Sequence, residues 1–499
     1  MKKSYRIAAL ALAALIFALT FAAGCGGDTP ASDETTAIAD VTAETESAET
    51  DRSQIPDDLP DDLDFGGEEF TIHVRGDQNS YAEFYSEQTG DIIDDAIYNR
   101  NRAVEERLNV KISVYKGKGW EAYNDELKNI RNTIQAGDDA WDVISGWSAR
   151  IPIVANEGVF RNLYDIPHIN FDREWWVQTL REELTVGGKL YFVTGDITLT
   201  LLQAAYSIFF NKAMAENYSI PDMYKTVIDG LWTIDKMRET ASLVKEDLNG
   251  DNVFDENDLY GLVITGINNA DCFMQSSGIR MIKKDENGYP ELDIEYEKLD
   301  VLVGKVYTLM YETDGVLSYN SEGGVYTENQ NKMFKSGRAL MIPSDLDRAR
   351  GGFKDMEDDY GIIPYPKYDE NQDRYLTRIQ DALALMCIPI TNPKTELAGA
   401  MLEAMAAESY RFVTPQYYEI AMKVKYSRDD ISSQMLDTIR SGANLNFASI
   451  YNESIGYPWF VMRDLMNKKS KDFASWHAKN ESKIIKALEK CVAAFEELG

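Results

Sequence analysis

The sequence predicts an α/β protein that begins with a parallel β-sheet, and three neighbouring stretches indicate it. Apolar residues alternate in 70–74 and again in 110–114, the pattern of half-buried strands. Between them, residues 91–108 carry apolar side chains at helical spacing, with acidic residues in the first turn. A strand, a helix and a second strand in this order predict a right-handed parallel crossover.

A third unit repeats the pattern, with a helix over 122–136 and a strand over 141–146. Ligands of open α/β sheets lie beyond the carboxyl ends of the strands. Those ends are Arg75–Asp77 and Gly146–Ser148, where we expect ligand contacts, and we interpret the Arg-Gly-Asp triplet as a turn from strand to loop. Later in the chain, 383–390 has the pattern of a buried strand, 393–407 that of an apolar-faced helix, and the last segment that of a packing helix.

The N-terminus has the features of an export signal. Basic residues precede an apolar run over 7–19, which is short for a membrane span, and small residues lead to Cys25. This stretch resembles the bacterial lipobox, although Ala22 stands where a leucine is usual. The resemblance implies a lipoprotein signal peptide over 1–24 and a lipidated Cys25 that anchors the protein outside the cytoplasm. The alternative is an ordinary secretory signal with a chance cysteine.

Residues 25–65 are predicted to be a disordered acidic linker. From residue 26 to about 64 the chain is rich in Asp, Glu, Thr, Ala and Ser, and Arg52 is its basic residue. Such a composition buries too little apolar surface to offset the entropy of ordering. We expect this segment to hold the folded body away from the membrane.

The overall charge narrows the possible partners. The chain of 499 residues has 51 Lys plus Arg against 83 Asp plus Glu, a formal charge of -32. This balance argues against nucleic acid and against docking on anionic lipid, both of which need a basic face. The part after Cys25 is long enough for two or three domains and has no second long apolar run.

Cysteine and motif content argue against a zinc site and against an enzyme of a familiar class. Cys272, Cys387 and Cys491 are widely spaced, without a zinc or disulfide pattern, and the last two are predicted to be small core residues. One disulfide involving Cys272 stays open. The sequence has no GxSxG, HExxH, P-loop or CxxC motif, so we predict that the protein is not an enzyme, with no organic cofactor.

One local motif has the spacing of a calcium-binding loop. Such a loop presents oxygen ligands at positions one, three, five, seven, nine and twelve. Here the predicted ligands are Asp247, Asn249, Asp251, the carbonyl of Val253, Asp255 and Asp258. The spacing resembles dockerin-type loops; Asn252 replaces the usual glycine, but Asn tolerates the left-handed conformation. We expect a structural calcium ion, and the alternative is a solvated acidic loop.

Ten further stretches occur in order along the chain: Thr89–Asp91, Asp95–Asn101, Val104–Val110, Trp141–Ile144, Gly158–Leu163, Gly188–Asp196, Ile208–Lys212, Trp232–Met237, Gly337–Met341 and Tyr360–Lys367. Together they resemble the large extracellular solute-binding lipoproteins of bacterial ABC importers, of the family 1, carbohydrate-binding type. Their order and coverage, from about residue 68 to about 400, make the resemblance specific, whereas 410–499 matches only in general character.

The resemblance implies a periplasmic-binding-protein-like fold of type II, with two interleaved α/β lobes joined by a hinge. Lobe 1 would comprise 66–204 plus 376–410, lobe 2 would comprise 205–375 with the calcium-type loop, and 411–499 would add C-terminal helices of unassigned lobe. The implied function is capture of a small solute, a carbohydrate or oligosaccharide, by lobe closure and its delivery to an ABC transporter permease by a monomer. Alternatives are a secreted glycoside hydrolase, a calcium-dependent adhesin, or a binding protein for another solute such as a peptide.

Candidate ligand-binding residues follow from chemistry and position. Sugar rings stack their C–H faces on aromatic planes, and carboxylates accept hydrogen bonds from hydroxyl groups. Trp147 and Asp196 are the strongest candidates because they lie at a strand exit and near a lobe crossing. The full set of predicted ligand residues is Trp147, Trp175, Trp176, Asp196, Asp345, Tyr375 and Asp381.

Overall fold

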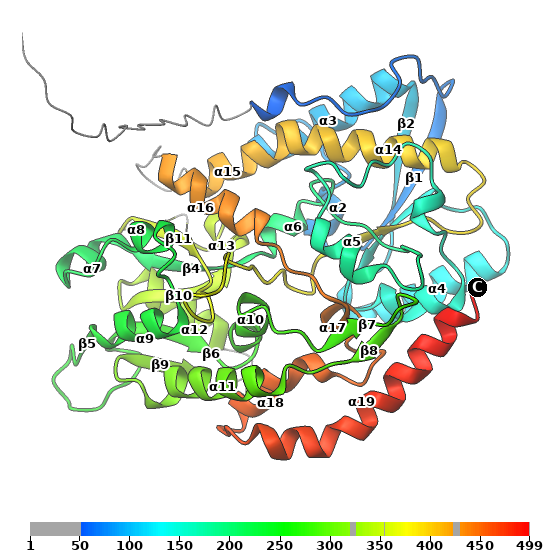
Figure 1. Ribbon diagram of the computed structural model, residues 1–499. Coiled ribbons are helices and arrows are strands. Elements are labelled where there is room, and N and C mark those ends of the chain that lie inside the picture. Colours follow the sequence, from blue (N-terminus) through cyan, green and yellow to red (C-terminus); the bar gives the residue numbers. More distant parts are fainter. Residues whose placement is uncertain (1–50, 320–325, 354, 423–429, 499) are drawn as a thin grey trace, which may run out of the picture. The chain divides into compact units, whose positions relative to one another are not determined.

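The computed structural model describes residues 51–319, 326–353, 355–422 and 430–498 (Figure 1). Residues 1–49 and 50–499 form separate units, and only the second is described below. The expected signal peptide, Cys25 and most of the expected linker therefore lie outside the described residues. Among the residues described, no helix combines the length and apolar character needed to cross a membrane.

The first sheet has four strands in the order β12-β3-β1-β2. β1 pairs in parallel with both β2 and β3, which confirms the predicted crossover, and β12 closes the sheet in antiparallel orientation. Asp91 caps the helix between β1 and β2 by accepting hydrogen bonds from two backbone amides in its first turn. The elements are β1 (Glu68–Val74), α3 (Ile92–Leu108), β2 (Val110–Lys116), α4 (Tyr123–Gln135), β3 (Val143–Trp147) and β12 (Ala384–Cys387).

The second sheet follows the order β11-β4-β10-β6-β5, and β9 also pairs with β6. β4 lies between β11 and β10 and is buried along its whole length, including its polar residues Ser207 and Asn211. The strands are β4 (Tyr206–Asn211), β5 (Lys245–Glu246), β6 (Leu259–Thr265), β9 (Val316–Tyr319), β10 (Ala339–Asp345) and β11 (Tyr360–Pro364).

Two connections join the sheets, one before β4 and one between β11 and β12. They run side by side: the amide of Tyr206 donates to the carbonyl of Arg378 at 2.9 Å, and the amide of Gln380 donates to the carbonyl of Ala204 at 2.9 Å. Two sheets joined by a paired double connection confirm the predicted two-lobed α/β fold. The hydrogen bonds fix the two connections to each other, so they act as one hinge.

Helices cover both sheets (Figure 1). Around the first sheet, α14 is buried on all sides from Leu397 to Ala407, which confirms the predicted apolar helix in this part of the chain. The remaining elements before the C-terminal region are α2 (Gln78–Ala82), α5 (Gln178–Leu184), α6 (Thr200–Gln203), α7 (Lys212–Asn217), α8 (Met223–Ile228), α9 (Ile234–Ser242), α10 (Asn268–Ser276), β7 (Ile282–Lys284), β8 (Pro290–Leu292), α11 (Tyr296–Tyr307), α12 (Tyr326–Lys335), α13 (Asp347–Arg350) and α14 (Thr395–Glu408).

The C-terminal region is helical, as predicted, and it contacts both lobes. The first turns of α19 lie against α11 of the second lobe, where Phe473 packs on Tyr296 with ring centroids 4.8 Å apart. At the other end of the helix, Phe495 stacks on Tyr191 of the first lobe at 5.9 Å. A helix of this length extends about 36 Å, so α19 links the two lobes (Figure 1). The helices are α15 (Thr414–Met422), α16 (Asp430–Ser441), α17 (Phe447–Ile450), α18 (Val461–Asn467) and α19 (Phe473–Glu496).

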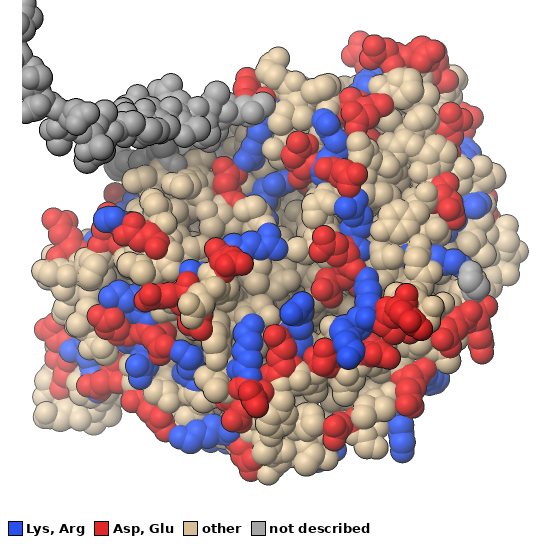
Figure 2. Space-filling model, in the orientation of Figure 1, with Lys and Arg blue, Asp and Glu red and all other residues tan. Residues whose placement is uncertain are grey.

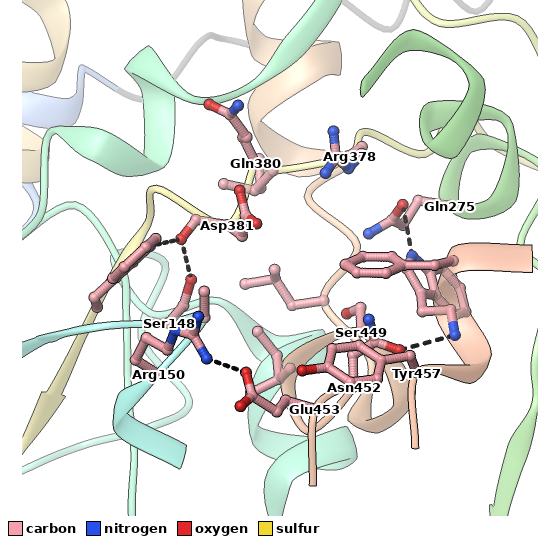
Figure 3. Close-up of a pocket in the computed structure, with 17 residues that line it drawn as sticks. Ser148, Arg150, Gln275, Arg378, Gln380, Asp381, Ser449, Asn452, Glu453 and Tyr457 are labelled. Atoms are coloured by element: carbon pink, nitrogen blue, oxygen red, sulfur yellow. Dashed lines mark hydrogen bonds and ion pairs between the residues drawn. The ribbon is translucent and has the colours of Figure 1, made fainter. Parts of the chain in front are cut away.

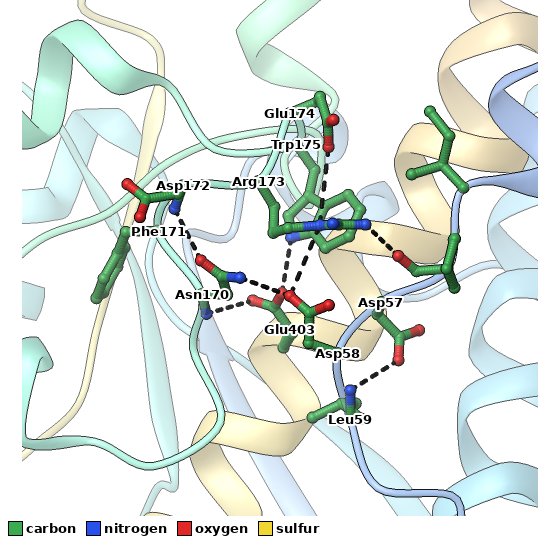
Figure 4. Close-up of polar contacts among 12 residues, drawn as sticks. Asp57, Asp58, Leu59, Asn170, Phe171, Asp172, Arg173, Glu174, Trp175 and Glu403 are labelled. Atoms are coloured by element: carbon green, nitrogen blue, oxygen red, sulfur yellow. Dashed lines mark hydrogen bonds and ion pairs between the residues drawn. The ribbon is translucent and has the colours of Figure 1, made fainter. Parts of the chain in front are cut away.

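The structure corrects the C-terminal limit of the expected linker, because residues 51–65 pack on the folded body. Leu59 is buried, and its backbone amide donates to the carboxylate of Asp57 at 3.2 Å (Figure 4). The same carboxylate accepts hydrogen bonds from Arg107 at 2.6 Å and from Arg411 at 3.2 Å. Composition suggested disorder here because large apolar residues are few. The few that are present pack on the hydrophobic core, and arginines of the body form ion pairs with Asp57 and Asp58.

The structure also shows whether the cysteines are buried and whether they form disulfides. Cys272, Cys387 and Cys491 are free and buried, which confirms the core assignment of the last two and leaves Cys272 without a disulfide. Burial raises the pKa of the Cys272 thiol to about 12, so it is protonated at neutral pH. On the face shown in Figure 2, acidic and basic side chains are interspersed over the surface.

Candidate functional site

A pocket of about 200 Å³ lies beyond the carboxyl end of β3 (Figure 3). This is the edge of the first sheet at which ligand contacts were expected. Four parts of the chain line it: the end of β3 with the following loop, α10, the returning hinge connection and the C-terminal region. The lining residues are Trp147–Arg150, Gln275, Arg378–Asp381, Leu445, Ser449–Ile450, Asn452–Glu453, Tyr457 and Trp459–Phe460.

The first-lobe wall is fixed by contacts to the hinge. The indole N–H of Trp147 and the hydroxyl of Ser148 both donate to the backbone carbonyl of Asp381, the latter at 2.9 Å. Tyr123 contacts the Trp147 ring edge to face at 5.5 Å, and the Arg75 guanidinium lies 5.3 Å from the same ring. The Trp147 side chain is therefore held in one orientation before any ligand binds.

A second tryptophan on the C-terminal wall is held as firmly. Trp459 is buried, its indole N–H donates to the side-chain oxygen of Gln275 at 3.3 Å, and its backbone amide donates to Asn452 at 2.9 Å. Because Gln275 belongs to α10 of the second lobe, this contact joins the C-terminal region to that lobe at the pocket.

Arg378 contributes a buried guanidinium from the hinge connection. It donates to the carbonyl of Asn268 at 3.3 Å and lies 3.9 Å from the carboxylate of Asp271. Burial alone would lower the pKa of Arg378, but the acidic groups around it outweigh burial and raise that pKa above its ordinary value. Arg378 thus remains a charged donor at the pocket.

At the other side of the pocket, Arg150 forms an ion pair with Glu453, and Tyr457 lies next to them (Figure 3). Tyr457 has a positive φ of 68° and is 40% exposed, with its ring stacked on Phe460 at 5.6 Å. The lining holds two arginines, Arg150 and Arg378, and two carboxylates, Asp381 and Glu453, so its formal charges balance. Together with the aromatic rings, this suits a neutral solute with many hydroxyl groups.

Of the seven predicted ligand residues, the structure places Trp147 and Asp381 at the pocket. Asp196 is instead buried in an ion pair with Arg440 and accepts a hydrogen bond from Thr414 at 2.7 Å. The prediction that Asp196 lies at the ligand site is therefore wrong, because its partner Arg440 comes from α16, a helix far away in the sequence.

Trp175 and Trp176 lie in the core of the first lobe, away from the pocket. The indole N–H of Trp175 donates to the carboxylate of Glu403 at 3.2 Å (Figure 4). The indole N–H of Trp176 donates to the same carboxylate at 3.0 Å. Burial raises the pKa of Glu403 to about 7 despite these donors. The two tryptophans therefore satisfy a buried carboxyl group.

Asp345 and Tyr375 also lie outside the pocket, where they contact other groups of the protein. Asp345 ends β10, where burial raises its pKa to about 6, and it lies 3.5 Å from Arg348. The Tyr375 hydroxyl donates to the carbonyl of Val227 at 3.0 Å, and burial raises its pKa to about 12. Tyr375 borders a different recess, between α8 and α16.

Sequence reasoning missed the C-terminal wall of the pocket. Residues 445–460 lie in the part of the chain where the family resemblance was weakest, so no position there was a candidate. One signal was present: three aromatic residues surround Pro458 within 457–460, directly after Gly456. Such a concentration of rings outside a helical pattern was the available clue.

The predicted calcium loop has the expected backbone but stays a prediction. Asn252 adopts the left-handed conformation at φ 59°. Asp247 accepts from the amides of Gly250 and Asn252 at 2.7 and 2.8 Å, and Asp258 accepts from Leu248 and Asp255 at 3.1 and 2.9 Å. Over the described residues, no three His, Cys, Asp or Glu side chains are gathered as a metal site. Each carboxylate oxygen retains a second lone pair, so an ion would have to draw these side chains together.

Comparison with known proteins identifies the fold. No protein-family model matches the sequence, and no curated protein matches it. Among solved structures, a cyclo/maltodextrin-binding protein complexed with maltotetraose aligns with a TM-score of 0.53 and 13% identity, over 86% of this chain and 96% of that chain. A sugar transporter from Rhizobium etli in an open conformation aligns with a TM-score of 0.52 and 13% identity, over 85% and 99% of the two chains.

A third structure, UspC of M. tuberculosis, aligns with a TM-score of 0.52 and 11% identity, over 84% of this chain and all of the other. At this level of identity the likeness establishes the fold and nothing finer. The fold is the two-lobed one of solute-binding proteins.

Proposed function

We propose that the protein captures a carbohydrate, as the extracytoplasmic solute-binding component of an ABC importer, and releases it unchanged to a membrane permease. The observation that carries the proposal is the pocket beyond β3, where firmly held tryptophans and hydrogen-bonding side chains meet at the hinge. Concave sites with aromatic walls and a few placed polar groups are typical of small-molecule binding. The maltotetraose bound by the cyclo/maltodextrin-binding protein, which has the same fold, supports this choice.

The mechanism follows from how the pocket is assembled. Its walls belong to the first lobe, to α10 of the second lobe, to the C-terminal region, and to the hinge connection that bears Arg378 and Asp381. A ligand that contacts all of these walls binds most tightly when they are close together, so it shifts the population toward the closed form. The ligand's preference for that form limits the size of the shift.

Secreted glycoside hydrolysis is the alternative from another class. It needs a pair of carboxyl groups on either side of the bond that is cleaved. The pocket lining contains two carboxylates, but Glu453 is engaged in an ion pair with Arg150. Binding without turnover is therefore the simpler function for this set of side chains.

A glycan array followed by calorimetric titration tests the proposal. We expect saturable binding of a neutral oligosaccharide, and chromatography of the mixture should recover that ligand intact. Release of shorter products would favour the hydrolase. Binding of peptides with no glycan bound would instead favour the non-sugar alternative.

We also propose that Cys25 carries a lipid anchor, on the basis of the lipobox-like sequence before it. Expression in a bacterial host should place the intact chain in the membrane fraction, whereas Cys25→Ser should move it to the soluble fraction. Equal membrane association of both chains would contradict lipidation at this residue.

Calcium binding by the loop 247–258 is a further proposal. Addition of calcium should raise the melting temperature, a chelator should lower it, and Asp247→Asn should remove this response. Asp285→Asn, in a different acidic turn, serves as the control. An unchanged melting temperature in the wild-type protein after chelation would contradict the proposal.

A further inference from the structure

A second exposed aromatic surface lies on the same sheet edge as the pocket. β3, β1 and β2 are neighbours and run parallel, so their carboxyl ends share one edge. Trp147 ends β3, Arg75 directly follows β1, and Trp120 lies in the short turn 120–122 that follows β2. With strands spaced about 4.8 Å apart, the ends of β3 and β2 are separated by about 10 Å.

Direct contacts connect the pocket to this surface. The Arg75 guanidinium lies 5.3 Å from the Trp147 ring, and its Nε is 2.5 Å from one carboxylate oxygen of Asp77. The other carboxylate oxygen of Asp77 accepts the backbone amide of Trp120 at 3.2 Å. An unbroken series of contacts therefore joins the two tryptophans through Arg75, which is itself buried at 8% exposure, and Asp77.

The loop that carries Trp120 packs closely against the loop that follows β1. A Cβ atom at Gly76 would lie 2.2 Å from the carbonyl oxygen of Gly117, and one at Gly119 would lie 2.9 Å from Asp77. Side chains at these glycines would push the two loops apart, so their absence allows the loops to pack backbone against backbone. The Trp120 side chain itself is 62% exposed, the highest value among the large apolar side chains described.

We infer that the binding surface continues from the pocket to an outer sugar subsite on Trp120, with Arg75 and Asp77 between them. The inference rests on the proposed function and makes it more specific. The ligand is an oligosaccharide long enough to extend from Trp147 to Trp120, and not a monosaccharide. An exposed indole offers a flat apolar face on which the C–H face of a terminal sugar ring stacks.

A length series tests the outer subsite. Linear malto-, cello-, xylo- and manno-oligosaccharides of increasing length are titrated calorimetrically against the wild type, Trp120→Ala, Trp120→Phe and Tyr164→Ala. Tyr164 is a matched control because it is 43% exposed and lies outside the pocket lining. Its hydroxyl group shares a hydrogen bond with the hydroxyl group of Thr185.

In the wild type, affinity should rise about tenfold once the chain is long enough to reach Trp120. Trp120→Ala should abolish that rise and leave the shortest bound member unchanged, Trp120→Phe should keep part of it, and Tyr164→Ala should keep all of it. A rise that survives in Trp120→Ala, or affinity that does not depend on length in the wild type, overturns the outer subsite and leaves the proposed function standing. If no series binds to the wild type, the proposed function fails together with the subsite.

Discussion

The indole of Trp147 and the backbone of Asp381 meet through a hydrogen bond across 234 positions of sequence. Trp147 ends a strand of the first lobe, and Asp381 lies on the connection that returns from the second lobe. The bond therefore attaches one wall of the pocket to the hinge. A ligand stacked on Trp147 would therefore contact a residue that is bonded directly to the hinge connection.

Replacement of Trp147 separates the two roles of its ring. Trp147→Ala removes both the stacking surface and the hydrogen bond, and we expect it to lower affinity for every bound oligosaccharide by about tenfold or more, which corresponds to at least about 1.4 kcal/mol. Trp147→Phe keeps a ring but cannot donate to Asp381, so its affinity should be intermediate. Calorimetric titration with the glycans found on the array provides the measurement.

Arg161→Lys, remote from the pocket lining, is a suitable control for general effects of substitution on the first lobe. Arg161 contacts backbone carbonyls of the chain segment around Asn392. Equal affinity of wild type and Trp147→Ala would show that the pocket beyond β3 is not the binding site.

The sequence predicted what depends on short-range pattern. Periodicity located β1, α3 and β2, and the rule for strand ends led to Trp147. The sequence did not reveal that Asp196 forms an ion pair with Arg440, or that the indole of Trp175 donates a hydrogen bond to Glu403. In both cases the partner comes from a distant part of the chain. A buried carboxylate and a ligand-binding carboxylate have the same sequence appearance, and only the fold tells them apart.

A substitution at Asp57 tests whether residues 51–65 are part of the folded body and not of a disordered linker. The side chain of Asp57 is almost fully buried, at 2% exposure, and it is bonded by both Arg107 and Arg411. Asp57→Asn should lower the free energy of unfolding by about 2 kcal/mol, because hydrogen bonds to charged groups contribute about that much. Urea unfolding is the measurement, and the exposed Asp62→Asn is the control. If both variants match the wild type, residues 51–65 do not stabilise the body.

A substitution at Phe495 tests whether the end of α19 is docked on the first lobe. The ring is buried near the end of the helix, between Tyr191 of the first lobe and Tyr451 of the C-terminal region. Phe495→Ala should lower the free energy of unfolding by about 3 kcal/mol, since it leaves a cavity. Ile485→Ala lies on the same helix at an exposed position and should have little effect. Similar unfolding curves for the two variants would mean that the end of α19 is not docked.

The raised pKa of Glu403 predicts that the free energy of unfolding falls as the pH rises. Burial raises its pKa from the ordinary value of 4.5 to about 7 in the folded protein. Between these two values the folded state holds a proton that the unfolded state has released. The contribution of this group to stability is therefore full below about pH 4.5 and is lost as the pH rises through about 7, a change of about 3 kcal/mol.

Glu403→Gln removes this ionisation while keeping a side-chain oxygen for the tryptophan N–H groups. Its free energy of unfolding should therefore fall less than that of the wild type between pH 5 and pH 8, and the difference between the two slopes isolates Glu403 from the other buried acids. The exposed Glu489→Gln should follow the wild-type slope. Denaturant titrations at intervals across this range provide the measurement. Parallel curves for wild type and Glu403→Gln would mean that Glu403 is already ionised in the folded protein at low pH, with its charge stabilised by the two indole donors and the amide of Asn170.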